Sequence, residues 1–246
     1  MKPTPYLPSG TVYGTLLNFQ REHALWAPRM HDAPYKAPPQ APVLYIKTAN
    51  TFTPDGQAIS LPRGVDQLEV AASLGLVAGE GGAVAGCVLF NDVAIPHESY
   101  YRPPVKYRCV DGFLGVGDAL RPMAELGGME ALASLVLELR VNGVVRQRAS
   151  LAGMVRDAAT LWADVNGFQS MRPGDVLMVG TDCLEDGTRV RVRAGDAVDI
   201  TAQGFRPLNH HFIQEASCDA GPPQGARAPS GGSAPHEVGS VGGASS

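Results

Sequence analysis

Two carboxylates stand within runs of apolar residues, where an ionised side chain needs a partner. Glu69 lies in the run 68–72, and Asp92 closely follows the apolar residues 88–90. An isolated charge is too costly in such surroundings, so each carboxylate must be paired, protonated or bound to a cation. The two together suggest a site for a hard cation, which prefers oxygen ligands. The alternative is that Glu69 lies on a solvated strand face and that Asp92 caps a turn.

Segment 96–113 carries the densest group of side chains that could bind a substrate. It holds His97, Glu98, Ser99, Tyr100, Tyr101, Arg102, Lys106, Arg108 and Asp111. A loop this rich in cations suits an anionic substrate with more than one carboxylate, because arginine offers a two-pronged donor. A solvated loop with satisfied surface charges is the alternative.

Other motifs narrow the chemistry. The sequence holds no G-x-S-x-G nucleophile motif and no glycine-rich nucleotide-binding motif, so neither acyl-enzyme hydrolysis nor nucleotide binding is indicated. The adjacent His210 and His211 would point to opposite faces of a strand, so they cannot easily share an ion and are predicted to be surface residues. Four separate cysteines without C-x-x-C spacing indicate reduced thiols in a cytoplasmic protein.

Composition and charge place the chain among ordinary globular proteins. Its 246 residues are 44% hydrophobic and 18% charged, and the formal net charge is -4. Because there is no basic field to attract phosphates, a nucleic-acid partner is not expected. The least polar stretch, 68–90, is interrupted by Glu69, Glu80 and several glycines, so no membrane span is expected.

Strand patterns dominate the elements that would position these side chains. Strands are predicted at 11–19, 43–47, 68–77, 86–91, 112–117 and 176–180, and helices at 20–26 and 150–168. Residues 195–200 are predicted to form a Gly-Asp turn that leads into a further strand. Asn142-Gly143 supplies the two positive φ angles of a tight turn, which predicts a hairpin between 132–141 and 144–147.

The chain is predicted to divide into three parts. Residues 1–40 supply a strand, a helical stretch and a proline-rich segment that lead into the fold, and residues 41–216 form the main, catalytic domain. Residues 217–246 are mostly Gly, Ala, Ser and Pro, which cannot offset their ordering entropy, so a disordered tail is expected. A flexible linker to a further domain is the alternative.

The order of short segments along the chain resembles that of the fumarylacetoacetate hydrolase family over residues 10–213. The matching segments are Asn18, Tyr45-Ile46-Lys47, Glu69, Asn91-Asp92-Val93, Asp111-Gly112-Phe113, Asn142-Gly143, Pro173-Gly174-Asp175, Gly180-Thr181, Gly195-Asp196 and residues 204–209. Residues 34–39 and 98–103 look like one branch of that family. This branch is the N-terminal half, or N-terminal subunit, of the bifunctional isomerase/decarboxylases of 4-hydroxyphenylacetate (homoprotocatechuate) degradation.

This resemblance implies a mixed, mainly-β fold of the fumarylacetoacetate-hydrolase type, a β-roll or sandwich with a few short helices. It also implies a Mg²⁺ or Mn²⁺ ion, held by an E-x-E pair and a later aspartate, that chelates a small anionic oxo acid. The implied reaction is a carbon-carbon lyase step, the loss of CO₂ from 5-oxopent-3-ene-1,2,5-tricarboxylate through a metal-stabilised dienolate. The product, 2-hydroxyhepta-2,4-dienedioate, is then isomerised to its oxo form.

The site residues follow from the same resemblance. Glu69 and Asp92 match two of the three metal-ligand positions, but Ala71 stands at the third, so the ion would bind weakly. The family lysine falls on Arg108, which keeps the charge but cannot release a proton, and Lys106 lies two residues away. The expected catalytic residues are Lys106, Arg108 and Glu98, and the expected substrate-binding residues are Arg102, Tyr101, Lys47, Gly180 and Thr181.

Departures from the family pattern leave three hypotheses. Glu22 and not the neighbouring His23 stands at the family histidine, so the water-activating pair of the hydrolases is not matched. The chain is either an active decarboxylase with isomerase activity, or a catalytically degenerate partner of a homologous C-terminal subunit with the full E-x-E set. A hydrolase or decarboxylase of small acylpyruvate-type oxo acids is the third. The first two imply a partner, either that homologous subunit or a second copy of this chain.

Overall fold

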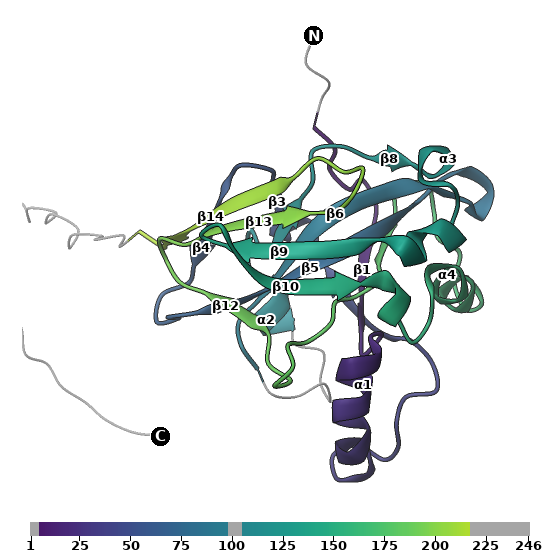
Figure 1. Ribbon diagram of the computed structural model, residues 1–246, viewed down its shortest axis with the longest axis horizontal. Coiled ribbons are helices and arrows are strands. Elements are labelled where there is room, and N and C mark those ends of the chain that lie inside the picture. Colours follow the sequence, from purple (N-terminus) through teal and green to yellow (C-terminus); the bar gives the residue numbers. More distant parts are fainter. Residues whose placement is uncertain (1–4, 98–104, 217–246) are drawn as a thin grey trace, which may run out of the picture. The chain divides into compact units, whose positions relative to one another are not determined.

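The computed structural model describes residues 5–97 and 105–216 (Figure 1). The tail predicted for 217–246 lies outside these residues, and so do Glu98, Tyr101 and Arg102. The described helices and strands belong to one unit that ends at Glu215. Within this part of the chain, every helix is too short or too polar to span a bilayer.

The larger sheet is built around two long antiparallel strands, β5 (Leu68–Ala78) and β6 (Val84–Ala94). Among the described residues its order is β2-β1-β11-β5-β6-β7-β3, with β12 paired to β5 and β8 paired to β6. The other strands are β1 (Val12–Leu16), β2 (Val43–Lys47), β3 (Phe52–Pro54), β7 (Leu114–Val116), β8 (Arg121–Pro122), β11 (Val176–Met178) and β12 (Val190–Val192). Strand β1 ends before the predicted position 19 because Leu17 adopts a positive φ of 58°.

A smaller sheet has the order β10-β9-β13-β14-β4 in the part of the chain described. Its strands are β4 (Ala58–Leu61), β9 (Val136–Val141), β10 (Val144–Ser150), β13 (Ala197–Thr201) and β14 (Leu208–Gln214). The hairpin predicted at Asn142-Gly143 joins β9 to β10, and its two turn residues have positive φ angles of 52° and 76°. The predicted turn and hairpin are therefore confirmed, although the first strand begins at Val136 and not at residue 132.

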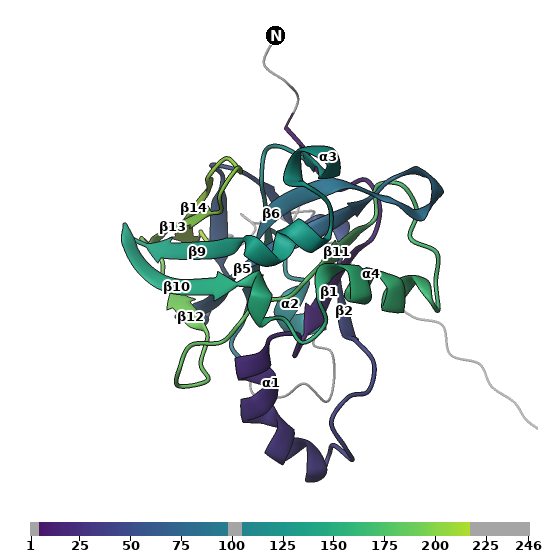
Figure 2. The same ribbon diagram turned by 45° about the vertical axis from the view of Figure 1, so that its right-hand side comes forward.

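Short helices connect the strands. They are α1 (Gln20–Trp26), α2 (Val105–Arg108), α3 (Met123–Leu126) and α4 (Ala158–Asn166), with 3-10 turns η1 (Ala27–His31), η2 (Ala49–Thr51), η3 (Glu80–Gly82), η4 (Glu130–Ser134) and η5 (Leu151–Gly153). In both views α1 extends away from the two sheets, beyond the end of β1 (Figure 2). The helix predicted at 150–168 is shorter, because Asp157 caps α4 by accepting the Thr160 N–H at 2.7 Å.

Strands β5 and β6 are buried on both faces, which explains why their sequences are nearly continuous apolar runs. On one face, residues such as Leu74 and Leu89 pack in a core shared with the smaller sheet. On the opposite face, Val77 and Phe90 belong to a second core. Because side chains alternate along a strand, Asp92 lies on this second face with Phe90. The two observed sheets and few short helices confirm the mainly-β prediction.

His210 is buried, so the prediction of a surface histidine was wrong for this residue. Its ring fills the space beside Gly115, where a Cβ atom would lie 2.3 Å from the imidazole Cε1. His211, on the other side of β14, is exposed. Alternation shows that two neighbours face opposite ways, but it does not show that one of those faces is covered by a second sheet.

The burial of His210 predicts a pH dependence of stability. Burial lowers the pKa of His210 below its usual value of 6.5. Its neutral form therefore adds stability above pH 6.5 that is lost as the pH falls below that value, because the unfolded chain then takes up a proton that the folded chain does not. We expect His210→Asn to flatten the change in Tm between about pH 8 and pH 5.5. His211→Asn is the control, and a flattening of equal size in both variants would contradict this account.

Candidate active site

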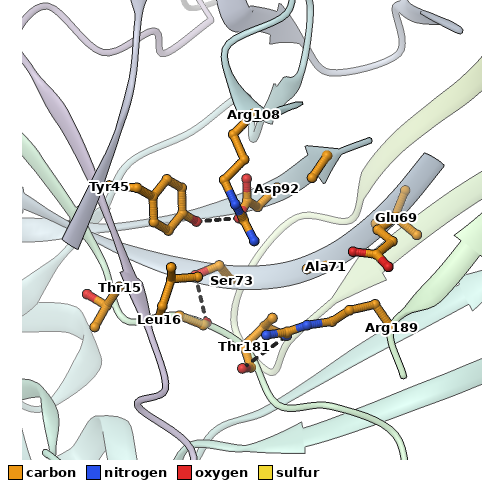
Figure 3. A pocket seen from close by; sticks show the side chains of 13 residues that line it. Thr15, Leu16, Tyr45, Glu69, Ala71, Ser73, Asp92, Arg108, Thr181 and Arg189 are labelled. Atoms are coloured by element: carbon orange, nitrogen blue, oxygen red, sulfur yellow. Dashed lines mark hydrogen bonds and ion pairs between the residues drawn. The ribbon is translucent and has the colours of Figure 1, made fainter. Parts of the chain in front are cut away.

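The candidate site lies on the face of the larger sheet that is turned away from the smaller one. Glu69, Ala71 and Ser73 project from β5 on this face, since side chains two residues apart share a face. Ala71 pairs directly with Asp92 across β5 and β6, so Asp92 projects beside it. These residues line a pocket that Arg108 and Arg189 also line (Figure 3). In the figure, the label of Ala71 lies between the side chains of Asp92 and Glu69.

Asp92 is the centre of a buried cluster of charges. Lys47 Nζ lies 2.8 Å from its Oδ1, and Arg108 Nη1 lies 3.0 Å from its Oδ2. The Tyr45 hydroxyl donates a hydrogen bond to Oδ2, and the Arg108 guanidinium carbon lies 4.5 Å from the centre of the Tyr45 ring. Both oxygens of this carboxylate are therefore already engaged by cations.

Lys47 contacts Asp92 and the surrounding backbone. Its side chain is fully buried, and its ammonium donates to the backbone oxygens of Val93 (2.7 Å), Arg108 (2.8 Å) and Phe113 (2.8 Å). An ammonium has three N–H donors, so the three carbonyls use all of them, and the contact with Asp92 Oδ1 is an ion pair. Lys47 is not among the described residues that line the pocket, and the contacts of its ammonium are with Asp92 and the three backbone oxygens.

The charges in the cluster fix its protonation. Burial alone would raise the pKa of Asp92, but the positive charges of Lys47 and Arg108 hold that pKa below its usual value. Burial raises the pKa of Tyr45 well above its usual value, and the negative Asp92 raises it further. Asp92 is therefore ionised, and Tyr45 is a neutral phenol that donates to it.

Another part of the pocket lining comes from the residues that follow β11 in the sequence. Gly180 has a φ of 91°, and a Cβ atom there would lie 2.7 Å from the backbone oxygen of Thr15, so the chain requires glycine at this position. Ser73 Oγ donates to the Gly180 oxygen at 2.8 Å. The Thr181 hydroxyl is buried at the pocket and has no hydrogen-bond partner among the described residues. Since buried polar groups are nearly always paired, this hydroxyl marks a place for a ligand oxygen or a water.

Arg189 forms the third side of the pocket and was not predicted from the sequence. Its Nη1 donates to the backbone oxygens of Thr181 at 3.2 Å and Asp182 at 2.9 Å, and its Nη2 is ion-paired with Glu22. Glu22, at the position of the family histidine, is buried and lies on α1, so this pair joins segments 167 residues apart. The residues next to Arg189 in the sequence do not predict the ion pair, because Glu22 comes from a distant part of the chain.

A second hollow adjoins this pocket. It shares Glu69, Arg108 and Arg189 with the pocket and adds Arg29 and Arg191 to the lining. Glu69 Oε1 lies 3.5 Å from Arg191 Nη2. Four arginines thus face the continuous cleft formed by the pocket and the hollow, against the carboxylates Glu69 and Asp92. Such a cleft favours an anionic ligand.

The structure brings five of the predicted site residues together. Glu69, Asp92, Arg108, Gly180 and Thr181 all line the pocket. In contrast, Lys106 is exposed, with its ammonium 5.8 Å from the centre of the Tyr107 ring, and it is not among the described lining residues. Glu98, Tyr101 and Arg102 lie outside the residues that the structure describes.

The donor set of this pocket does not fit the Mg²⁺ or Mn²⁺ ion expected from the family resemblance. Within residues 5–97 and 105–216, no group of three or more His, Cys, Asp or Glu side chains is arranged to hold a metal ion. Ala71 offers no ligand atom, and Asp92 is already held by Lys47 and Arg108. Hard divalent ions need several oxygen ligands, so these residues do not form a resident metal site by themselves.

Comparison with known proteins shows which family the chain is similar to. The chain matches the model of the family described as fumarylacetoacetate (FAA) hydrolase C-terminal over residues 11–213. It is 31% identical over 216 residues to the 4-hydroxyphenylacetate degradation bifunctional isomerase/decarboxylase of Escherichia coli, covering 84% of this chain and 48% of the relative. A second Escherichia coli relative, a homoprotocatechuate catabolism bifunctional isomerase/decarboxylase, is 30% identical over the same shares. The chain therefore spans about half the length of these relatives.

Solved structures share the fold. Fumarylpyruvate hydrolase from Pseudomonas aeruginosa, in complex with Mn²⁺ and pyruvate, has a TM-score of 0.69 at 19% identity, covering 87% of this chain and 93% of that chain. The 5-carboxymethyl-2-hydroxymuconate delta-isomerase of Mycobacterium smegmatis has a TM-score of 0.66 at 20% identity, covering 87% and 82%. At these identities the similarity confirms the predicted fold type.

Proposed function

Because this chain belongs to the fumarylacetoacetate (FAA) hydrolase family, we propose that it takes part in the decarboxylation and isomerisation of an oxo-tricarboxylate in 4-hydroxyphenylacetate degradation. The proposed substrate is 5-oxopent-3-ene-1,2,5-tricarboxylate. The observation that carries this proposal is the cleft lined by four arginines, namely Arg29, Arg108, Arg189 and Arg191. A guanidinium matches a carboxylate with two parallel hydrogen bonds, so a cleft with several arginines suits a substrate with three carboxylates.

The proposed decarboxylation needs groups that stabilise the negative charge formed when CO₂ leaves. When the bond to the leaving carboxylate breaks, its electron pair moves through the conjugated chain to the ketone oxygen, which gives CO₂ and a dienolate. Protonation of that oxygen gives 2-hydroxyhepta-2,4-dienedioate. Arg108 and Arg189 would stabilise the developing charge, because fixed cations in a water-poor pocket act strongly on a transition state. For the isomerisation, Glu69 is the pocket carboxylate that could move a proton from the enol oxygen to carbon.

A partner is part of the proposal, since the chain spans about half the length of its bifunctional relatives. The partner would be a homologous subunit that corresponds to the other half, or a second copy of this chain. A second candidate function is that of a catalytically degenerate partner. It is favoured by one observation, namely that Ala71 and the ion-paired Asp92 leave this pocket without a metal donor set.

The test is CO₂ release from the oxo-tricarboxylate by the purified chain, alone and mixed with the homologous C-terminal subunit. Turnover by the chain alone is expected if Arg108 and Arg189 suffice to stabilise the dienolate. Turnover only in the mixture, at a rate above that of the C-terminal subunit by itself, would support the degenerate partner. A chain that is inert alone, and that neither binds nor accelerates the C-terminal subunit, would refute both functions.

A further inference from the structure

We propose that this pocket binds the oxo-acid end of its ligand without a resident divalent ion, with the Arg108 guanidinium, held on Asp92, supplying the positive charge. The kind of ligand rests on the proposed function. The inference goes beyond that function by assigning the electrophilic role to a side chain of this chain, whereas a structural neighbour was solved with Mn²⁺ and pyruvate.

The first step of the argument is the register of β5 and β6. Residue 71 is paired directly with Asp92, and Cβ atoms of such pairs lie about 4.5–5.5 Å apart. Glu69 lies on the same face of β5, so a carboxylate at position 71 would bring three carboxylates together at the pocket. Ala71 removes the middle one. What remains is two carboxylates separated by a methyl group.

The second step is the charge on those two carboxylates. Asp92 is held by Lys47 at 2.8 Å and by Arg108 at 3.0 Å, while Glu69 lies 3.5 Å from Arg191. Each carboxylate therefore already has a cation beside it. A divalent ion placed between them would meet these cations at short range and would need Asp92 to release them. Because Lys47 is also fixed by three carbonyls, that release is opposed by the surrounding backbone.

The third step is what the pocket offers to an anion. Arg108 and Arg189 both line it, and the buried Thr181 hydroxyl at the pocket has no hydrogen-bond partner among the described residues. Guanidinium groups stay charged at any physiological pH and bind carboxylates with a fixed fork, and a hydroxyl can donate a further hydrogen bond. This set of donors would hold the adjacent carboxylate and oxo groups of an oxo acid directly.

The experiment uses the full chain with two probes, Mn²⁺ alone and oxalate alone. Oxalate carries two adjacent carboxylates and so resembles the enolate end of an oxo acid. Mn²⁺ binding is measured from the electron paramagnetic resonance signal of the free ion, and oxalate binding by calorimetry in EDTA and in Mg²⁺. We expect no Mn²⁺ site tighter than about 1 mM, which is the weak end for hard cations in proteins. We expect oxalate to bind equally in EDTA and in Mg²⁺.

Two double variants test the exchange of a metal for a guanidinium. Ala71→Glu with Arg108→Gln restores the middle carboxylate and removes the competing cation, so it should gain Mn²⁺ binding of at least about tenfold. Ala71→Gln with Arg108→Gln has nearly the same size without the carboxylate, so it should gain nothing. If neither double variant folds, the measurements on the unaltered chain still decide the question.

The outcomes separate this inference from the proposed function. A tight Mn²⁺ site in the unaltered chain, or oxalate binding that requires Mg²⁺, would overturn the inference while leaving decarboxylation possible. Failure of oxalate to bind in either condition would overturn it as well. Metal-free oxalate binding by a chain that never releases CO₂, alone or with its partner, would support the inference and refute the proposed catalysis.

Discussion

Replacing Asp92 with asparagine is expected to lower the free energy of unfolding by about 3–5 kcal/mol, the range for breaking a buried ion pair by removing one partner. Asparagine keeps the size of the side chain, so the loss is of charge and not of volume. Lys47 and Arg108 would then remain in the interior with no carboxylate between them. Urea denaturation of the two proteins at neutral pH measures the difference.

A matched control for this variant is Asp164→Asn. Asp164 accepts from Arg156 Nε at 2.9 Å, but that ion pair is solvent-exposed. Exposed pairs contribute at most about 1 kcal/mol, so this control should change stability little. If Asp92→Asn costs no more than the control, Asp92 is not the centre of a buried charge cluster.

The pKa of Asp92 also determines the pH below which its ion pairs no longer stabilise the folded chain. Lys47 and Arg108 hold its pKa below the usual value of 3.8 despite its burial. The stabilising effect is therefore complete above that usual value and is lost only as the pH falls through the lower pKa of the folded chain. It acts in a different pH range from that of His210, so the two effects can be measured separately.

Replacing Arg189 with glutamine is expected to weaken oxalate binding by about 10–100-fold, since hydrogen bonds to charged groups contribute about 1.5–3 kcal/mol. Arg189 lines both the pocket and the hollow outside it, and Glu22 and two backbone oxygens fix its direction. Calorimetry with oxalate in EDTA gives the dissociation constants.

Two further variants separate the charge of Arg189 from its shape. Arg189→Lys keeps the charge but loses the fork, so its affinity for oxalate should fall between those of the unaltered chain and Arg189→Gln. Arg206→Gln is the control, because Arg206 is an exposed arginine that pairs with Asp118 at 2.9 Å, and Arg206 is not among the described residues lining the cleft. Unchanged oxalate binding in Arg189→Gln would remove Arg189 from the site.

Much of the local structure and part of the site could be predicted from the amino-acid sequence. Apolar runs bounded by turn residues predicted the central strands, and the Asn142-Gly143 turn predicted the hairpin that the structure contains. The order of motifs predicted the family and its fold, which the comparisons confirm. It also pointed to Glu69, Asp92 and Gly180-Thr181, which the structure places in one pocket. These features could be predicted because they depend on residues close together in the sequence, or on the order of motifs along the chain.

Which charged side chains contact one another could not be predicted from the sequence, because it depends on how distant segments pack. The pairing of Arg189 with Glu22 spans 167 residues, and that of Tyr45 with Asp92 spans 47. Lys47 was expected to face a substrate, yet it lies behind Asp92 with its donors used. Likewise, nothing in the pair His210-His211 shows which of the two faces the core. Alternation fixes which side chains share a face, but what covers that face and neutralises its charges depends on strand register between distant segments.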